Sequence, residues 1–272
     1  MGHPVFFLHG TPGSWVGPVP RQRILYDQGI KLISYDRPGY GSSDRLLART
    51  VADVVPDVVA IADSLDIDQF AVLGRSGGGP HALACAALLP GRVTRASALV
   101  SLAPPDADGL NWFNGMADSN VDAYTTAATD PELLTARLVQ AAAKIKANPT
   151  SHVADLGLEM PPPDRLVVAD AGIRAMLAQN FAEALRTSAD GWIDDVLALC
   201  SAWEFDLSAI EAPVLLWHGE DDVFSPVAHT QWLARRIATA HMEIRPGSAH
   251  FGALEVLPDI MSWLIRPMPV AT

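Results

Sequence analysis

The chain has 272 residues, of which 49% are hydrophobic and 18% charged, with a formal net charge of −12 at pH 7. This composition is typical of a folded globular protein, and the length suits one large α/β domain with an insertion. The negative charge argues against a nucleic-acid partner, because phosphate backbones are bound by clustered Lys and Arg. No apolar stretch approaches the roughly 18 residues of a membrane span. We therefore expect a small-molecule substrate and neither a nucleic-acid nor a membrane partner.

The termini and cysteines indicate a cellular compartment. Met1 to Pro4 carry no basic segment, and the apolar residues that follow are typical of a strand, so we expect no signal peptide. Cys85 and Cys200 lie far apart in different expected elements. Two unpaired thiols are the usual state in a reducing compartment, which predicts a cytoplasmic protein. The sequence does not indicate an oligomeric state.

Short apolar segments alternate with helical patterns along residues 1–103 and 213–272. Most of these segments are apolar at every position, as strands covered by helices on both sides must be. The pattern predicts an α/β fold with a mostly parallel central sheet and helices on both faces. We expect strands at 5–8, 31–35, 70–73, 96–102, 214–217 and 242–245, and helices at 19–28, 51–65, 78–89, 227–237 and 253–264.

The helical pattern at 51–65 contains a proline. Thr50 is a plausible N-cap, with Asp53 three residues later. Pro56 lies inside the pattern, so this helix is either kinked or begins later.

Residues 104–212 break the alternation. They are helical in pattern at 131–146, 166–185 and 189–200, with a proline-rich link at 161–163. Because they lie between two expected strands of one sheet, we interpret them as a helical cap inserted into a core formed by 1–103 and 213–272.

A Gly-x-Ser-x-Gly sequence follows the apolar strand at 70–73 and opens a helix of small residues. A tight turn in this context holds its central residue, Ser76, in a strained backbone and lifts the hydroxyl clear of the sheet. Gly74 and Gly78 lie two residues to either side, where a Cβ would collide across the turn. The sequence lacks the Gly-Lys-Ser/Thr ending of a nucleotide-binding loop, so we do not interpret it as a phosphate site.

Five motifs follow strands in a fixed order along nearly the whole chain. They are His-Gly-Thr-Pro-Gly at 9–13, Asp-Arg-Pro-Gly-Tyr-Gly-Ser-Ser at 36–43, the serine turn at 74–78, Gly-Glu-Asp-Asp-Val-Phe-Ser-Pro at 219–226, and Gly-Ser-Ala-His-Phe at 247–251. With these motifs in this order, the chain resembles members of the α/β-hydrolase superfamily. Within that superfamily it is similar to capped, esterase-like serine hydrolases. Members usually begin with an antiparallel hairpin before the first of these strands. That hairpin is missing here, either because this lineage lacks it or because the sequence is cut short.

The resemblance implies a catalytic triad of nucleophile, base and acid. Ser76 would be the nucleophile, and a serine hydroxyl needs a base within reach. His250 matches the family's histidine and follows the last expected strand, whereas His241 opens that strand and His229 falls on an expected helix. The family's acid lies four residues before a proline, which selects Asp222. Asp221 and, after the strand at 96–102, Asp106 remain alternatives, and Glu220 fits a solvated turn.

Acyl transfer also needs donors for the developing oxyanion. The family pattern supplies one backbone N–H from Gly77, directly after the nucleophile, and one from the loop after the first strand. Thr11 is the candidate in that loop because Pro12 has no N–H. We interpret His9 as bracing the loop, and Asp36 and Arg37 as making hydrogen bonds within the 36–43 loop.

Arg75, directly before the nucleophile, has two interpretations: a structural salt bridge, which we favour, or a contact to an anionic group of the substrate. Large apolar residues of the cap and loops could line an apolar pocket. They are Trp15, Trp112, Phe113, Met116, Trp192 and Phe251.

These residues predict a hydrolase that needs no cofactor, since no His/Cys/Asp cluster has metal-ligand spacing. We expect it to cleave a small carboxylic ester through an acyl-enzyme on Ser76, with a thioester, lactone or amide as other substrates. The same triad could serve an acyltransferase, lyase or perhydrolase, because the fold does not fix the reaction. A non-catalytic small-molecule-binding module is a further alternative.

Overall fold

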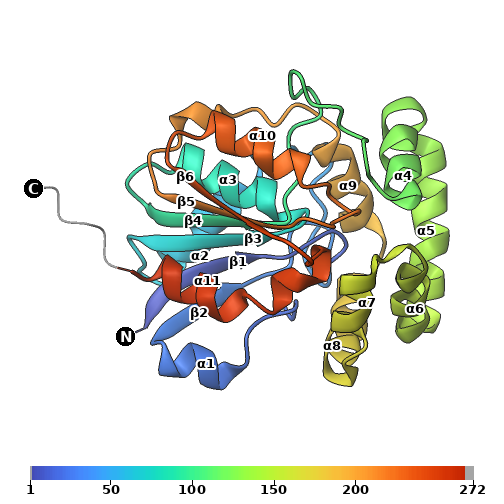
Figure 1. Cartoon of the computed structure of the whole chain (residues 1–272), viewed down its shortest axis with the longest axis horizontal. Coiled ribbons are helices and arrows are strands. Elements are labelled where there is room, and N and C mark those ends of the chain that lie inside the picture. The colour runs from blue at the N-terminus through green and yellow to red at the C-terminus, as the bar shows by residue number, and fades with distance from the viewer. Residues whose placement is uncertain (1, 267–272) are drawn as a thin grey trace, which may run out of the picture.

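The computed structural model describes residues 2–266 and contains one six-stranded sheet in the order β2-β1-β3-β4-β5-β6. Every strand pairing in residues 2–266 is parallel. Helices cover both faces of the sheet (Figure 1), so the predicted fold class is confirmed. The strands are β1 (His3–Leu8), β2 (Ile30–Ser34), β3 (Phe70–Arg75), β4 (Val93–Leu99), β5 (Val214–Gly219) and β6 (Ala240–Arg245).

Alternate residues of the central strands bury two separate apolar layers. Phe6 and Leu8 of β1 face one layer, while Val5 and Phe7 face the other. The first layer packs against α2 (Val54–Ser64), α3 (Gly78–Leu88) and α10 (Ala228–Arg236), and the second against α1 (Gln22–Asp27) and α11 (Leu257–Leu264). Side chains leave a strand on alternate sides, so a strand covered on both faces must be apolar throughout.

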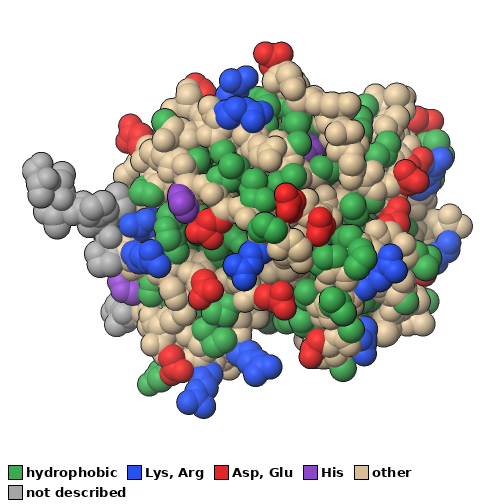
Figure 2. Space-filling view, viewed as in Figure 1, with side chains coloured by type: hydrophobic (Ala, Val, Ile, Leu, Met, Phe, Trp, Pro, Cys, Tyr) green, Lys and Arg blue, Asp and Glu red, His purple; other side chains and the backbone are tan. Residues whose placement is uncertain are grey.

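The edge strand β6 differs from the central strands because most of its side chains are exposed. His241 and Glu243 form an ion pair there, with 3.4 Å between nitrogen and oxygen. Polar side chains on an edge discourage pairing with another strand. Figure 2 shows acidic and basic side chains interspersed over this face of the molecule. No helix in residues 2–266 is long and apolar enough to cross a bilayer.

Six helices lie between β4 and β5 and form a layer beside the carboxyl ends of the strands (Figure 1). Two of them, α4 and α6, have no counterpart among the expected helices, and the expected helix at 166–185 is divided. The division falls at Asp170, whose carboxylate accepts a hydrogen bond from the Ile173 N–H at 2.9 Å and so caps a new helix. The six are α4 (Asp118–Thr129), α5 (Pro131–Ala147), α6 (Pro149–Glu159), α7 (Pro162–Val168), α8 (Ala171–Ala184) and α9 (Asp190–Leu199).

The helix with an internal proline begins late rather than kinking. Its first residue is Val54, and Asp53 Oδ2 accepts a hydrogen bond from the Thr50 N–H at 2.7 Å. This bond closes a turn over 50–53 and places Pro56 in the first turn of α2, where its missing N–H has no helical partner to lose.

Candidate active site

The serine turn has the strained geometry that its glycines require. Ser76 has a φ of +55°, a left-handed value that is uncommon for a residue with a side chain. The Ser76 N–H donates to the Leu99 carbonyl at 2.8 Å, and the Gly79 N–H donates to the Ser76 carbonyl at 2.8 Å. A Cβ on Gly74 would collide with the carbonyl of Gly78. The hydrogen bonds and the close backbone approach together hold Ser76 at the end of β3.

The turn lies where the strand order of the sheet reverses. The chain passes from β1 outward to β2 and then returns to the other side of β1 to form β3. The carboxyl ends of β1 and β3 are therefore neighbours with diverging connections, and such a switch point leaves a crevice in open α/β sheets. Gly10 and Thr11 follow β1, and Ser76 follows β3, so both segments border this crevice.

Of the candidate acids, Asp222 is the one whose carboxylate meets His250. His250 Nδ1 lies 2.8 Å from Asp222 Oδ2, and both side chains are buried. Asp221 and Asp106 are exposed. No hydrogen bond joins Ser76 to His250 in the part of the chain that the structure describes, but both side chains line one cavity.

Asp222 is held by more partners than the sequence indicated. Its Oδ1 accepts hydrogen bonds from the N–H groups of Phe224 at 2.8 Å and Ser225 at 3.1 Å. His218 Nε2 lies 3.2 Å from Oδ2. Burial alone would raise the pKa of Asp222, but the charge of His250 and the hydrogen bonds from His218 and His250 outweigh it and leave the pKa below its usual range. Asp222 is therefore an anion at neutral pH.

Two backbone N–H groups beside Ser76 are free to donate. Among residues 2–266, neither the Gly77 nor the Thr11 amide has a hydrogen-bond acceptor. A Cβ on Gly77 would lie 3.3 Å from the Thr11 nitrogen, so the two segments are in close contact. Unpaired amides at the edge of a cavity are the feature that an oxyanion site requires.

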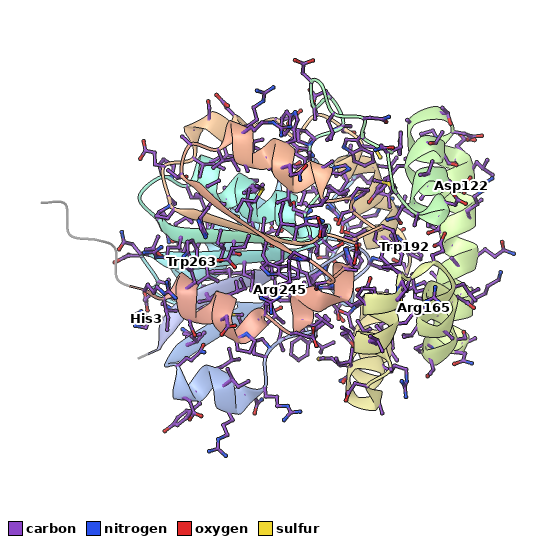
Figure 3. The ribbon with its side chains drawn as sticks, in the orientation of Figure 1. His3, Asp122, Arg165, Trp192, Arg245 and Trp263 are labelled. Atoms are coloured by element: carbon purple, nitrogen blue, oxygen red, sulfur yellow. The ribbon has the colours of Figure 1, made fainter. Side chains whose placement is uncertain are left out.

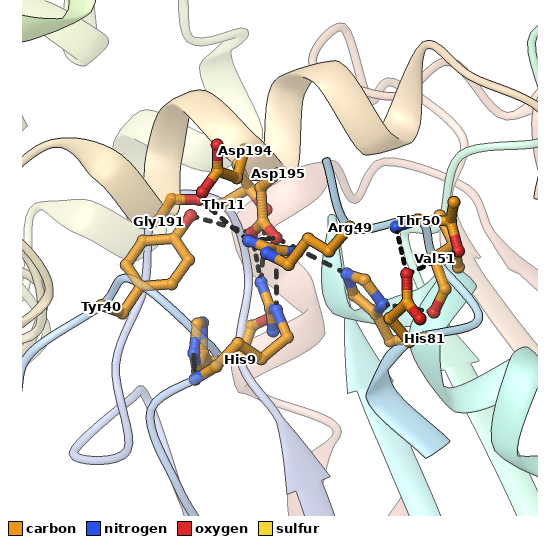
Figure 4. A network of polar contacts seen from close by, with 12 residues as sticks. His9, Thr11, Tyr40, Arg49, Thr50, Val51, His81, Gly191, Asp194 and Asp195 are labelled. Atoms are coloured by element: carbon orange, nitrogen blue, oxygen red, sulfur yellow. Dashed lines mark hydrogen bonds and ion pairs between the residues drawn. The ribbon is translucent and has the colours of Figure 1, made fainter. Parts of the chain in front are cut away.

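A buried ionic network lies behind the Thr11 loop (Figure 4). Asp195 of α9 forms ion pairs with Arg37 and with Arg49, the latter at 2.6 Å. Thr11 Oγ1 donates to Asp195 Oδ2 at 2.5 Å, and Tyr40 donates to the same oxygen at 2.8 Å. Burial alone would raise the pKa of Asp195, but the two guanidinium groups hold it well below its usual range. The network fixes the loop that carries the Thr11 amide to a helix of the insertion.

The residues interpreted as scaffold join the 36–43 loop to the segment that follows β1. His9 Nδ1 lies 2.8 Å from the Gly10 carbonyl, and its Nε2 accepts from the Arg37 N–H at 3.2 Å. Arg37 also donates to the His9 carbonyl at 2.6 Å, and Asp36 accepts from the Trp15 N–H at 2.8 Å.

The cavity has a volume of about 390 Å³ and extends from Ser76 to the helices of the insertion. Three of the predicted pocket residues line it: Arg75, Trp192 and Phe251. Trp192 lies on α9 between the sheet and the outer helices (Figure 3). Unforeseen lining residues come from α4, α5, α6 and α8 and include Tyr124, Leu138, Leu156 and Phe181.

The structure corrects the pocket prediction at the other four residues. Trp15 and Phe113 are 51% and 40% exposed and do not line the cavity. Trp112 and Met116 are buried in the apolar core instead. Trp112 packs edge-on against Tyr124 and His229 and donates its indole N–H to the Ala103 carbonyl at 2.9 Å. Trp112 and Met116, which follow β4, therefore pack in the core. Their residue types alone do not distinguish a core position from a position in a pocket wall.

The favoured interpretation of Arg75 is also wrong, because it forms no salt bridge. Among residues 2–266, no carboxylate lies within ion-pair distance of its guanidinium, and Nε and Nη1 are buried without a hydrogen-bond partner. Its Cζ lies 5.9 Å from the centre of the Phe251 ring. Burial lowers the pKa of Arg75 to about 10, so the group stays charged at neutral pH.

Asp164 of α7 is a buried residue that the sequence interpretation missed. Its Oδ1 accepts a hydrogen bond from the Phe251 N–H at 2.7 Å, so it holds the segment that begins with His250. Its Oδ2 is buried without a partner. Burial raises the pKa of Asp164 to about 6. The proline-rich link before it gave the one local signal, a helix start with an acid in the first turn.

The parallel sheet, with a strained serine turn after its third strand, defines an α/β protein of the hydrolase class. A family model described as alpha/beta hydrolase fold matches residues 3–255, and the chain belongs to that family.

Similar proteins agree with this assignment. The chain is 27% identical over 268 residues to a non-heme chloroperoxidase of Streptomyces lividans, covering 96% of this chain and 89% of that protein. It is 25% identical over 259 residues to a 2-hydroxymuconate semialdehyde hydrolase of Pseudomonas putida, covering 93% and 83%. A solved enol-lactonase from Burkholderia xenovorans superposes with a TM-score of 0.68 at 19% identity, covering 97% and 90%. Relatives named as hydrolases support hydrolase activity.

Proposed function

We propose that this protein is a cofactor-independent serine hydrolase that cleaves a small carboxylic ester through an acyl-enzyme on Ser76. The observation that carries the proposal is the 2.8 Å bond between Asp222 and His250 beside a cavity that also exposes Ser76. A buried carboxylate that accepts from Nδ1 leaves Nε2 of His250 as the acceptor for a serine proton.

The proposed reaction has two half-reactions. His250 takes the proton of Ser76 as its oxygen attacks the ester carbonyl, and then donates that proton to the leaving alcohol. Water, activated by His250 in the same way, releases the acid from Ser76. The amides of Gly77 and Thr11 bind the oxyanion in both steps. Asp222 stabilises the imidazolium, because its low pKa keeps it negatively charged throughout.

The test is turnover of 4-nitrophenyl butyrate by the protein and by Ser76→Ala. We expect kcat to fall by about 10³-fold or more, since removing a nucleophile leaves only binding and oxyanion stabilisation. Ser64→Ala, on the exposed side of α2, is the matched control and should retain full activity. A fluorophosphonate probe should label the protein but not Ser76→Ala. Undiminished turnover by Ser76→Ala would contradict the proposal.

A second candidate is acyl transfer to hydrogen peroxide, which the likeness to a non-heme chloroperoxidase favours. The same acyl-enzyme would then release a peracid instead of an acid. Adding peroxide to the ester assay and measuring peracid formation separates the two reactions. We also propose a cytoplasmic location, which the free thiols of Cys85 and Cys200 support.

A further inference from the structure

The wall of the cavity contains a buried positive charge that has no ion-pair partner among residues 2–266. Arg75 is 6% exposed and lines the cavity directly before Ser76. Two of its guanidinium nitrogens, Nε and Nη1, have no hydrogen-bond partner. Buried polar groups are nearly always satisfied in folded proteins, and buried charges are paired, so an orphaned guanidinium needs an explanation.

The guanidinium and Ser76 both lie close to Gly10. A Cβ added to Gly10 would lie 3.5 Å from Ser76 Cβ and 3.6 Å from Arg75 Nη2. Gly10 itself lines the cavity and precedes the Thr11 amide of the proposed oxyanion site. A ligand group bound to Nη2 would therefore be only a few bonds away from a carbonyl carbon placed for attack by Ser76.

Most of the other charged groups near the cavity are already engaged, and Asp155, which also lines it, is exposed to solvent. Asp222 is bound by His250, and Oδ1 of Asp164 by the Phe251 N–H. Among the described lining residues, Arg137 is paired with Asp122 at 2.6 Å, and Glu159 accepts hydrogen bonds from Ser119. Asp222 and Asp164 attract the Arg75 charge from beyond ion-pair distance. They reduce the positive potential around Arg75, which favours a singly charged anion over a doubly charged phosphate.

We propose that Arg75 binds a carboxylate on the acyl part of the substrate, so that the substrates are monoesters of short dicarboxylic acids. The ester hydrolysis in this inference rests on the proposed function. The binding of a carboxylate by Arg75 is argued from the geometry around Arg75 alone. Water would cleave the ester to the free dicarboxylate and an alcohol. The carboxylate would accept a hydrogen bond from Nη2 and balance the unpaired charge of the guanidinium, in a bond that is strong because both groups are charged.

The first test compares two esters that differ in one charge: the mono-4-nitrophenyl ester of glutaric acid and 4-nitrophenyl pentanoate. We expect kcat/KM for the charged ester to exceed that of the neutral one by about tenfold or more. In Arg75→Gln the ratio of the two kcat/KM values, charged ester over neutral ester, should fall to about one or below. In Arg75→Lys the ratio should lie between that of Arg75→Gln and that of the unchanged protein. An equal preference in the protein and in Arg75→Gln would overturn the inference.

The second test measures binding without turnover, which separates this inference from the proposed function. Monomethyl glutarate is titrated calorimetrically into Ser76→Ala and into Ser76→Ala/Arg75→Gln, with methyl pentanoate as the neutral control. We expect the second change to weaken binding of the charged ligand by about tenfold or more and that of the neutral one much less. This result would support the carboxylate site even if no ester were hydrolysed. Ester turnover with no such difference would overturn the site and leave the proposed function intact.

A structural role for Arg75 has its own prediction. If Arg75 served only to balance Asp164, then Arg75→Gln would lower the melting temperature and Asp164→Asn would restore it. The preference for the charged ester would then be the same in the protein and in the double variant. That combination would overturn the inference, whereas loss of the preference in a variant with normal circular dichroism and melting temperature supports it.

Discussion

Ser76 and Asp222 are held by opposite means. The left-handed backbone of Ser76 costs on the order of 1 kcal/mol or more, so it persists only because surrounding contacts enforce it. Asp222 is held by charge and hydrogen bonds, since two backbone N–H groups, His218 and His250 all surround one carboxylate. Strain thus holds Ser76, the proposed nucleophile, and the bound carboxylate orients His250, the proposed base.

The charge of Asp222, rather than its shape, should matter for activity. Asp222→Asn can still accept the bonds from Phe224 and Ser225, so we expect the fold to be kept. It cannot stabilise an imidazolium and favours the wrong tautomer of His250, so kcat should fall by about 10³- to 10⁴-fold. Kinetics with 4-nitrophenyl butyrate and a thermal melt would measure both effects. Asp221→Asn, the exposed neighbour, is the control, and an equal loss in that variant would contradict the assignment of the acid.

At the scale of elements, α9 joins the helical insertion to the sheet. Its Asp195 reaches Thr11, which follows β1, and Arg37 and Arg49, which lie in the connection between β2 and α2. Its neighbour Asp194 instead pairs with Arg45, whose side chain is 34% exposed. One helix thus carries both a buried and a partly solvated ion pair, and the two should differ in their contribution to stability.

Asp195→Asn should destabilise the protein by about 3 kcal/mol, because it leaves two buried guanidinium groups with reduced compensation. Asp194→Asn should cost no more than about 1 kcal/mol, since a partly exposed pair is screened by water. Urea unfolding of both variants measures the difference. We also expect Asp195→Asn to lower kcat, because Thr11 loses an acceptor that fixes its loop. Equal midpoints for the two variants would show that the network does not stabilise the fold.

The central elements were predictable from the sequence, and the helical layer was less so. Strands such as β3 and β5 are buried at every position and begin with four consecutive apolar residues, a pattern that few other structures require. In α4 and α6 the apolar residues are sparse, and only α6 has a capping side chain that marks its start. Asn148 followed by Pro149 starts α6, with Asn148 accepting from the Ser151 N–H.

The candidate site also has one part that the sequence predicts and another part that it does not. The positions of Ser76, Asp222 and His250 follow from strand ends, because parallel strands deliver their carboxyl ends to one edge. The contacts of Asp195 with Thr11 and of Asp164 with Phe251 join residues 184 and 87 positions apart, across helices whose packing no local pattern specifies. The missing partner of Arg75 is likewise visible only once every neighbour has been placed.

For the molecule as a whole, Asp164 links stability to pH. Burial raises its pKa from 3.8 to about 6, so the folded protein binds this proton more tightly than the unfolded chain. The contribution of protonated Asp164 to the free energy of unfolding is complete below about pH 4 and is lost as the pH rises through about 6. This contribution is about 3 kcal/mol.

Asp164→Asn should remove this loss. The amide oxygen can still accept from the Phe251 N–H, and no charge has to be buried. We expect the variant to be more stable than the parent at pH 7.5 and about equal to it at pH 4, as measured by urea unfolding at both values. Asp259→Asn, an exposed acid on α11, should show no such divergence. If the free energies of unfolding of the parent and of Asp164→Asn differed by the same amount at both pH values, the proposed link between Asp164 and pH would be contradicted.

The attachment of α9 also bears on how a molecule reaches the cavity beside Ser76. Pulling that helix outward would expose Arg37 and Arg49 without their anion, so we expect it to stay with the strands. The outer helices α4, α5, α6 and α8 also line the cavity, and we expect access to depend on them instead. Exchange rates should therefore respond to changes in those segments while α9 stays still.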